Sequence, residues 1–232
     1  MKYNTLIFDA DDTLFDFSYA EKLAIKQIII SRIDKKEFEK YFQIYKEVNR
    51  QVWSEREQNL ITFDELKSER FRRFFDLTGL KLNAIQAGKE YLTNLSKVTK
   101  LMPFAYYVIR KLSKDFTIAI LTNGLTSVQK PRLFNSSIYN FVNVIVISEE
   151  VGFSKPESGI FEILCKKIGY YDKTKMLMIG DNYFSDILGG IKFGIDTCWI
   201  TQNQYEINKI PNFIPPTYLI NSILEIPKLF YR

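Results

Sequence analysis

The sequence predicts an α/β fold: a doubly wound, Rossmann-like parallel sheet that carries an inserted subdomain of α-helices. Short apolar runs of strand length alternate with longer segments at helical periodicity, a pattern typical of a parallel sheet covered on both faces. In addition, the connection between the first two runs is unusually long. Thr13 follows the first run and Thr122 the second, and 109 positions separate them, whereas a crossover helix with its loops needs about 30 residues. The excess must form a structure of its own.

Five apolar runs are predicted to be buried strands, and the first of them is ended by acidic residues. In chain order the runs are Thr5 to Phe8, Thr117 to Leu121, Val142 to Ile147, Lys175 to Ile179 and Thr197 to Ile200. Between the last four runs, apolar residues recur at helical spacing, for example at Ile160, Leu164 and Ile168. These segments are expected to be the helices that cover the sheet.

The inserted segment is predicted to be a helical cap, because its apolar residues have helical spacing and it contains almost no turn residues. Thr62 and Glu65 form a capping-box pattern that starts one of its helices. Gly79 and Asn83 indicate a break between its later helices. The predicted bounds are 17–97 for the helical cap, and 1–16 together with 98–232 for the α/β core.

The composition excludes several classes of protein. The chain has 232 residues, of which 46% are hydrophobic and 25% charged, so it is globular rather than disordered. No apolar run approaches the roughly 18 residues of a membrane span and no signal peptide is visible, so we expect a cytoplasmic protein without a membrane partner. Cys165 and Cys198 lack metal-ligand spacing and are expected to be buried thiols in a reducing compartment. The absence of histidine excludes Ser-His-Asp and Cys-His catalysis and histidine-bound zinc.

The net charge of 32 minus 27, or +5, is small and scattered. This favours a small anionic ligand over a nucleic-acid polymer. One segment, Arg70 to Phe75, mixes arginine and phenylalanine, and three interpretations remain open for it: a solvated helix face, which we favour, an anion-contacting face, or a nucleic-acid contact. We expect a monomer or a weak homodimer.

Polar residues follow four predicted strands, at the edge of the sheet where open parallel sheets bind ligands. They are Asp9, Asp11 and Thr13 after the first strand, Thr122 and Asn123 after the second, Lys155 shortly after the third, and Asp181 and Asp186 after the fourth. Each residue taken alone has a structural explanation as a turn, a helix cap or a surface charge. Their joint occurrence at four strand ends predicts a site.

The aspartates favour a divalent cation. Two carboxylates forced together repel each other unless a cation or a shared proton intervenes. Asp9, Asp11 and Asp181 offer oxygen ligands of the kind that Mg²⁺ prefers. An EF-hand calcium loop is disfavoured, because Leu14 and Ala20 stand where that loop needs glycine and glutamate.

The remaining residues suit a phosphate group. Thr122 and Asn123 offer a hydroxyl and backbone N–H groups in a loop before a helix. Lys155 precedes a proline, so its backbone is extended and its side chain can reach the same strand ends. Asp186 is expected to steady the site behind Asp181.

These residues resemble, in order and spacing, the four motifs of the haloacid dehalogenase superfamily. The matching segments are Asp9 to Thr13, Thr122, Lys155-Pro156, and Gly180-Asp181 followed by Asp186. The position of the insert is similar to that of the family's helical cap. Within the family, Asp11 indicates a phosphatase, because the dehalogenases lack an acid at this position.

The resemblance implies a role for each residue. Asp9 is the implied nucleophile that forms an aspartyl-phosphate, and Asp11 the implied acid and base. The implied phosphate ligands are Thr122, the Asn123 amide and Lys155. The implied Mg²⁺ ligands are Asp9, Asp181 and the Asp11 backbone carbonyl. Asp186 and Thr13 are implied supporting residues, and Asp186 is implied to orient either a metal-bound water or Lys155.

More narrowly, the chain resembles the pyrimidine 5′-nucleotidase subgroup, which acts on nucleoside monophosphates. The segments that carry this resemblance are Leu121 to Ser127, Ile147 to Gly152, Ser185 to Gly190, and the cap around Asn49, Trp53 and Arg70, the implied substrate contacts. We therefore expect a Mg²⁺-dependent nucleoside 5′-monophosphatase. Two alternatives stay open: a phosphatase of sugar phosphates or other small organic phosphates, and a switch that accepts phosphate on an aspartate without turnover.

Overall fold

A computed structural model describes residues 2–202, 207 and 209–231 of the chain. It contains two compact units. The α/β unit comprises Met1–Asp16, Thr99–Thr126 and Leu133–Arg232, and the helical unit comprises Phe17–Val98 and Ser127–Arg132. Residues 127–132, which were predicted to belong to the α/β core, group with the inserted helices in the structure.

The α/β unit is built on a sheet in which every neighbouring pair of strands is parallel. The strand order is β3-β2-β1-β4-β5-β6, which confirms the predicted doubly wound fold. The strands are β1 (Thr5–Phe8), β2 (Thr117–Thr122), β3 (Val144–Ile147), β4 (Met176–Gly180), β5 (Asp196–Ile200) and β6 (Tyr218–Ile220). The edge strand β6 was not predicted, because it is only three residues long and is partly exposed.

The central strand fixes where the functional residues meet. Phe8, the last residue of β1, lies level with Ile120 of β2 and with Ile179 of β4. The carboxyl ends of these three strands therefore lie side by side, and the residues that follow them share one edge of the sheet.

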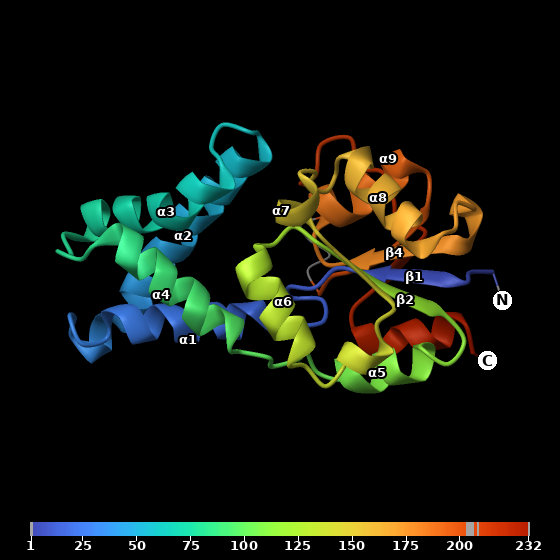
Figure 1. Cartoon of the computed structure of the whole chain (residues 1–232), viewed down its shortest axis with the longest axis horizontal. Helices are drawn as coiled ribbons and strands as arrows, with labels where there is room; N and C mark the ends of the chain where they lie inside the picture. Colours follow the sequence, from blue (N-terminus) through green and yellow to red (C-terminus); the bar gives the residue numbers. More distant parts are fainter. Residues whose placement is uncertain (1, 203–206, 208, 232) are drawn as a thin grey trace. The chain divides into compact units, whose positions relative to one another are not determined.

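Both faces of the sheet are buried. Leu6 and Phe8 of β1 point into one core, and Ile7 points into the other, as the alternation of side chains along a strand requires. The first core is closed by α5 and the C-terminal turn η5, and the second by α8 and α9 (Figure 1). The helices and turns of this unit are α5 (Ala105–Leu112), α6 (Thr126–Phe134, shared with the helical unit), η2 (Tyr139–Phe141), α7 (Ser148–Val151), α8 (Ser158–Ile168), η3 (Lys173–Lys175), η4 (Tyr183–Ile187), α9 (Leu188–Phe193) and η5 (Ile223–Leu229).

The helical unit contains α1 (Phe17–Ile29), η1 (Lys35–Glu37), α2 (Phe38–Glu57), α3 (Phe63–Thr78) and α4 (Ala84–Ser96). The predicted capping box of Thr62 and Glu65 is present at the start of α3. Gly79 ends α3 with φ of 74°, a conformation that favours glycine, and Asn83 caps α4. Within the described part of the chain, no helix is both long enough and apolar enough to cross a membrane.

Candidate active site at the carboxyl ends of the strands

Asp9 lies directly after β1, at the centre of the sheet edge. Its backbone N–H donates to Ile179 O (2.9 Å), so the strand pairing with β4 holds it in place. The chain then turns tightly, because the N–H groups of Leu14 and Phe15 both donate to Ala10 O (2.9 Å each). Asp12 adopts a positive φ of 57° within this turn. The turn carries Asp11, which is half-buried, and brings the buried Thr13 back toward the strand ends.

Lys155 joins two of the predicted carboxylates. Its Nζ atom donates to Asp9 Oδ1 (2.5 Å) and to Asp186 Oδ1 (2.6 Å), and the lysine is only 1% exposed. Burial would lower the pKa of Lys155, but the negative charges of Asp186 and Asp9 raise it above its ordinary value. Lys155 is therefore a buried ammonium ion, and its charge is part of the site.

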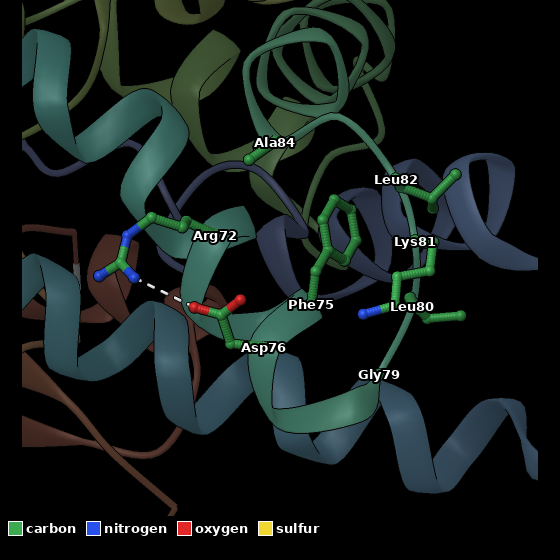
Figure 2. Close-up of a pocket in the computed structure, with 8 residues that line it drawn as sticks. All are labelled: Arg72, Phe75, Asp76, Gly79, Leu80, Lys81, Leu82 and Ala84. Carbon is green, nitrogen blue, oxygen red and sulfur yellow. Dashed lines mark hydrogen bonds and ion pairs between the residues drawn. The ribbon is translucent and has the colours of Figure 1, made fainter.

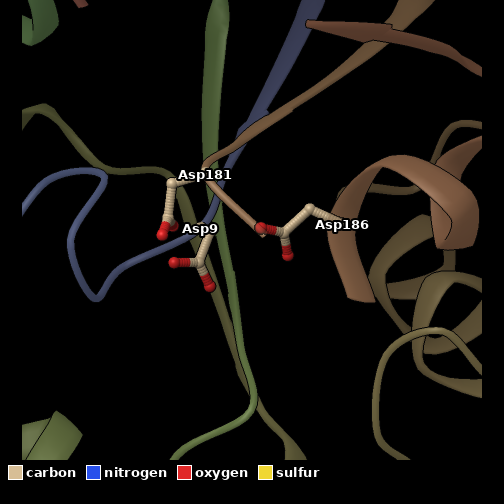
Figure 3. Close-up of side chains that lie close together, drawn as sticks. All are labelled: Asp9, Asp181 and Asp186. Carbon is tan, nitrogen blue, oxygen red and sulfur yellow. The ribbon is translucent and has the colours of Figure 1, made fainter. Parts of the chain in front are cut away.

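Asp9, Asp181 and Asp186 form a cluster in which one carboxylate oxygen from each lies within 4.8 Å of the others (Figure 3). Burial raises the pKa of Asp9 well above its ordinary value, and Lys155 only partly opposes this. Burial, followed by the charge of Asp186, raises the pKa of Asp181 to about 7. When all three carboxylates are ionised, the single positive charge of Lys155 leaves two negative charges among these described residues, and the raised pKa values of Asp9 and Asp181 reflect the cost of that state. Oxygen ligands and two uncompensated negative charges suit a divalent cation such as Mg²⁺.

The carboxylates of Asp181 and Asp186 accept hydrogen bonds from different donors. Thr13 Oγ1 donates to Asp181 Oδ1 (3.0 Å). Asp186 Oδ1 accepts from Lys155, while its Oδ2 accepts from the Asn182 N–H (3.0 Å). Lys155, one of the two partners that the resemblance implied for Asp186, is therefore in direct contact with it.

The turn that carries Asp186 is a π-helical turn, η4, capped by Asn182, whose Oδ1 accepts from the N–H groups of Phe184 and Ser185. The turn folds the carboxylate back over the end of β4. A methyl group on Gly180 would lie 2.7 Å from Asp186 Cβ, so only glycine leaves room for this arrangement.

Thr122 is the last residue of β2 and is 1% exposed, so the structure brings it to the same sheet edge. The side chain of the next residue, Asn123, has a partner that the sequence did not indicate. Its Nδ2 donates to Lys155 O (2.8 Å), and its Oδ1 accepts from Lys155 N (2.7 Å). The same loop is also tied to α7, because Ser148 Oγ donates to Gly124 O (3.3 Å).

The three residues predicted to contact substrate from the helical unit lie together within that unit. Asn49 and Trp53 are one turn apart on α2, and the Arg70 guanidinium lies 5.7 Å from the centre of the Trp53 ring. Asn49 Nδ2 donates to Glu21 Oε1 (2.8 Å), and Arg70 Nε donates to Leu66 O (2.9 Å). Asn49 and Arg70 are buried, whereas Trp53 is partly exposed.

The favoured interpretation of the Arg70 to Phe75 segment was wrong for its first arginine. Arg70 is 2% exposed rather than solvated, while Arg72 is exposed and forms ion pairs with Glu69 and Asp76. Spacing explains the difference, because Arg70 is four residues from both Leu66 and Phe74, which face the core of the helical unit.

A hollow of about 330 Å³ opens beside the end of α3 (Figure 2). It contains none of the predicted site residues, and its Arg72 is already paired with Asp76 (3.0 Å). It is lined by Arg72, Phe75, Asp76, Gly79, Leu80, Lys81, Leu82 and Ala84.

The family model described as haloacid dehalogenase-like hydrolase matches residues 3–194. The chain belongs to this family. It is 32% identical over all of its length to the whole of the pyrimidine 5′-nucleotidase YjjG of Escherichia coli. It is 30% identical, over 97% of its length and 94% of the relative, to the pyrimidine 5′-nucleotidase PynA of Streptococcus pneumoniae. The crystal structure of the haloacid dehalogenase-family hydrolase YfnB of Bacillus subtilis, bound to magnesium, superposes with a TM-score of 0.88 at 29% identity, covering both chains completely.

These comparisons confirm the resemblance predicted from the motifs, the α/β fold, and the prediction that the protein is an enzyme. The matched range includes Asp9, Thr122, Lys155, Asp181 and Asp186, the residues at the sheet edge described above.

Proposed function

We propose that the protein is a Mg²⁺-dependent phosphatase that hydrolyses pyrimidine nucleoside 5′-monophosphates through an aspartyl-phosphate. The observation that carries this proposal is the buried contact between Lys155 and Asp9. A second acid, Asp11, follows Asp9 by two residues on the turn after β1. An oriented nucleophile, a nearby acid and a fixed ammonium ion are the groups that phosphoryl transfer requires. The names of YjjG and PynA support the choice of substrate.

The proposed reaction has two steps. In the first, an Asp9 carboxylate oxygen attacks phosphorus as the bond from phosphorus to the ester oxygen breaks, and Asp11 gives its proton to the departing nucleoside oxygen. In the second, water attacks the phosphorus of the aspartyl-phosphate while Asp11 accepts the water proton, which releases inorganic phosphate and regenerates Asp9. Thr122, the Asn123 backbone N–H and Lys155 hold the phosphoryl oxygens in both steps.

The proposed cation ligands are the carboxylates of Asp9 and Asp181 and the backbone carbonyl of Asp11. Bound there, Mg²⁺ would offset the negative charge that the carboxylates and the phosphoryl group bring together. Asp186 is occupied by Lys155 and by the Asn182 N–H, so its part is to hold the lysine. Thr13 keeps Asp181 oriented.

We propose that Asn49, Trp53 and Arg70 recognise the nucleoside. Their grouping within the helical unit supports this, and the partly exposed Trp53 ring offers an aromatic face for a base. Replacement of Trp53 by alanine is expected to raise KM for a nucleotide about tenfold, a loss of about 1.4 kcal/mol of stacking, while Trp53→Phe retains most of it. Equal effects on ribose 5-phosphate, which has no aromatic group, would argue against base recognition by this residue.

The deciding experiment is phosphate release from dTMP, UMP, dUMP, AMP, GMP and several sugar phosphates, with Mg²⁺ and with EDTA, for the wild type and Asp9→Asn. The proposal expects Mg²⁺-dependent turnover of the pyrimidine nucleotides that is lost in Asp9→Asn. Preference for sugar phosphates would replace the substrate class. Phosphorylation of one aspartate per chain without turnover would instead identify a switch.

A further inference from the structure

We infer that the side chain of Asn123 is a positioning residue, which sets the place of the Lys155 ammonium by holding the lysine backbone. This inference rests on the proposed function, because it assigns a rate effect to a side chain outside the reacting groups. The resemblance implied a role only for the Asn123 amide, as a phosphate ligand. The structure gives its carboxamide a separate task.

The carboxamide binds both polar atoms of the Lys155 backbone. Nδ2 donates to the carbonyl oxygen at 2.8 Å, and Oδ1 accepts from the N–H at 2.7 Å. Two hydrogen bonds from one planar group fix an orientation as well as a distance. Asn123 follows β2, whereas Lys155 lies 32 residues later, before α8, so this pair ties together two loops of the sheet edge.

The position of the Lys155 backbone matters because its side chain has little freedom. Nζ lies between Asp9 Oδ1 and Asp186 Oδ1, at 2.5 and 2.6 Å, and the side chain is 1% exposed. A shift of the backbone must therefore lengthen one of these contacts or move a carboxylate. Because Asp9 is the proposed nucleophile, a displacement of about 1 Å lowers the rate by up to about 100-fold.

The chemistry of the contact requires asparagine. Aspartate has the same shape and can still accept from the Lys155 N–H, but it cannot donate to the carbonyl oxygen and places a carboxylate oxygen against it. Alanine reaches neither atom. Ser148 offers a matched control, because its hydroxyl donates to Gly124 O in the same loop, at 3.3 Å, without touching Lys155.

The test compares wild type, Asn123→Asp, Asn123→Ala and Ser148→Ala. Initial rates are measured with p-nitrophenyl phosphate at saturating Mg²⁺, and crystal structures of the wild type and Asn123→Asp locate Lys155 Nζ. We expect kcat to fall 10- to 100-fold in both Asn123 variants, KM to stay within about threefold, and Ser148→Ala to keep kcat within about twofold. In Asn123→Asp, Nζ should have left hydrogen-bond distance of Asp9 or Asp186.

Three results would overturn the inference. A tenfold rise in KM with kcat retained would show that the side chain contacts substrate directly. Loss of rate with Nζ still bound to both carboxylates would show that it acts by another route, and an equal loss in Ser148→Ala would show that only general order of the loop matters. If the wild type hydrolyses no phosphate ester, the proposed function fails, but the two crystal structures still decide whether Asn123 positions Lys155.

Discussion

Removal of divalent cations is expected to make the stability of the protein depend on pH through Asp181. Burial and the charge of Asp186 raise the pKa of this carboxyl from 3.8 to about 7. Between these two values the folded protein holds a proton that the unfolded chain has lost, so the free energy of unfolding falls as the pH rises through this window. The contribution of Asp181 to the free energy of unfolding is therefore largest below pH 4, and it has disappeared just above pH 7. Asp9, whose pKa is also raised by burial, acts in the same direction.

The size of the effect follows from the shift. A difference of about 3 pKa units at about 1.4 kcal/mol each corresponds to about 4 kcal/mol over the whole window, and to about 2–3 kcal/mol between pH 5 and pH 8. For a chain of this length, a loss of about 2–3 kcal/mol lowers the unfolding temperature by roughly 5–10 °C. Saturating Mg²⁺ should remove most of this dependence, because a cation beside Asp181 favours the ionised carboxylate.

The assay is thermal unfolding at pH 5 and pH 8, in EDTA and in Mg²⁺, for the wild type and for Asp181→Asn, which cannot titrate. Asp172→Asn is a matched control, because this carboxylate caps a turn at the protein surface and its pKa is lowered by Thr174 rather than raised. If wild type and Asp181→Asn lose the same stability between pH 5 and pH 8 in EDTA, the reasoning is wrong. It is equally wrong if Mg²⁺ raises the unfolding temperature by the same amount at both pH values.

Three further substitutions test separate parts of the structure. Lys155→Met leaves Asp9 and Asp186 buried without their ammonium partner, so we expect about 3–5 kcal/mol less stability in urea unfolding and no measurable turnover; a stable, active variant would contradict this role. Gly180→Ala should displace Asp186 from Lys155 and lower kcat at least about tenfold, and an unchanged kcat would show that the turn after β4 adjusts freely. Thr62→Ala removes the capping box of α3 and should cost about 1 kcal/mol in unfolding while leaving kcat unchanged; a change in kcat would connect this helix end to the reaction.

The meeting of Asp9, Lys155 and Asp181 could be predicted from the sequence because it depends on topology. Parallel strands place their carboxyl ends at one edge, so polar residues after buried runs must come together once the runs are recognised as strands. The register of β1 with β2 and β4 brings the ends of these strands within two residues of one another. No knowledge of side-chain packing was needed for this part of the site.

Arg70 shows a signal that was present but read wrongly. Leu66, Arg70 and Phe74 recur every four residues on α3, so the stripe that carries two apolar core residues also carries the arginine. The arginines of this segment were assigned mostly to the helix face opposite the apolar residues. The structure buries Arg70 instead, with Nε donating to Leu66 O and the guanidinium close to the Trp53 and Tyr91 rings.

The partner of the Asn123 side chain and the local fold around Asp186 left no pattern in the sequence. The hydrogen bonds of Asn123 run from a side chain to the backbone of a residue 32 positions away, and no periodicity records such a contact. The direction of Asp186 depends on a π-helical turn and on the missing side chain of Gly180, both of which are decided by local packing. These are details of fit within a few ångströms, whereas the strand pattern determines only which residues share an edge.

Three charged groups of the site have a neutral supporting partner. Thr13 donates to Asp181, the Asn182 N–H donates to Asp186, and Asn123 holds the backbone of Lys155. Buried charges keep one geometry only when such hydrogen bonds limit their alternatives, because their attraction alone would allow several arrangements of similar energy. Loss of one supporting hydrogen bond should therefore reduce the rate by more than it reduces stability, since a net bond contributes about 1 kcal/mol to folding whereas a misplaced nucleophile costs up to about 100-fold in rate.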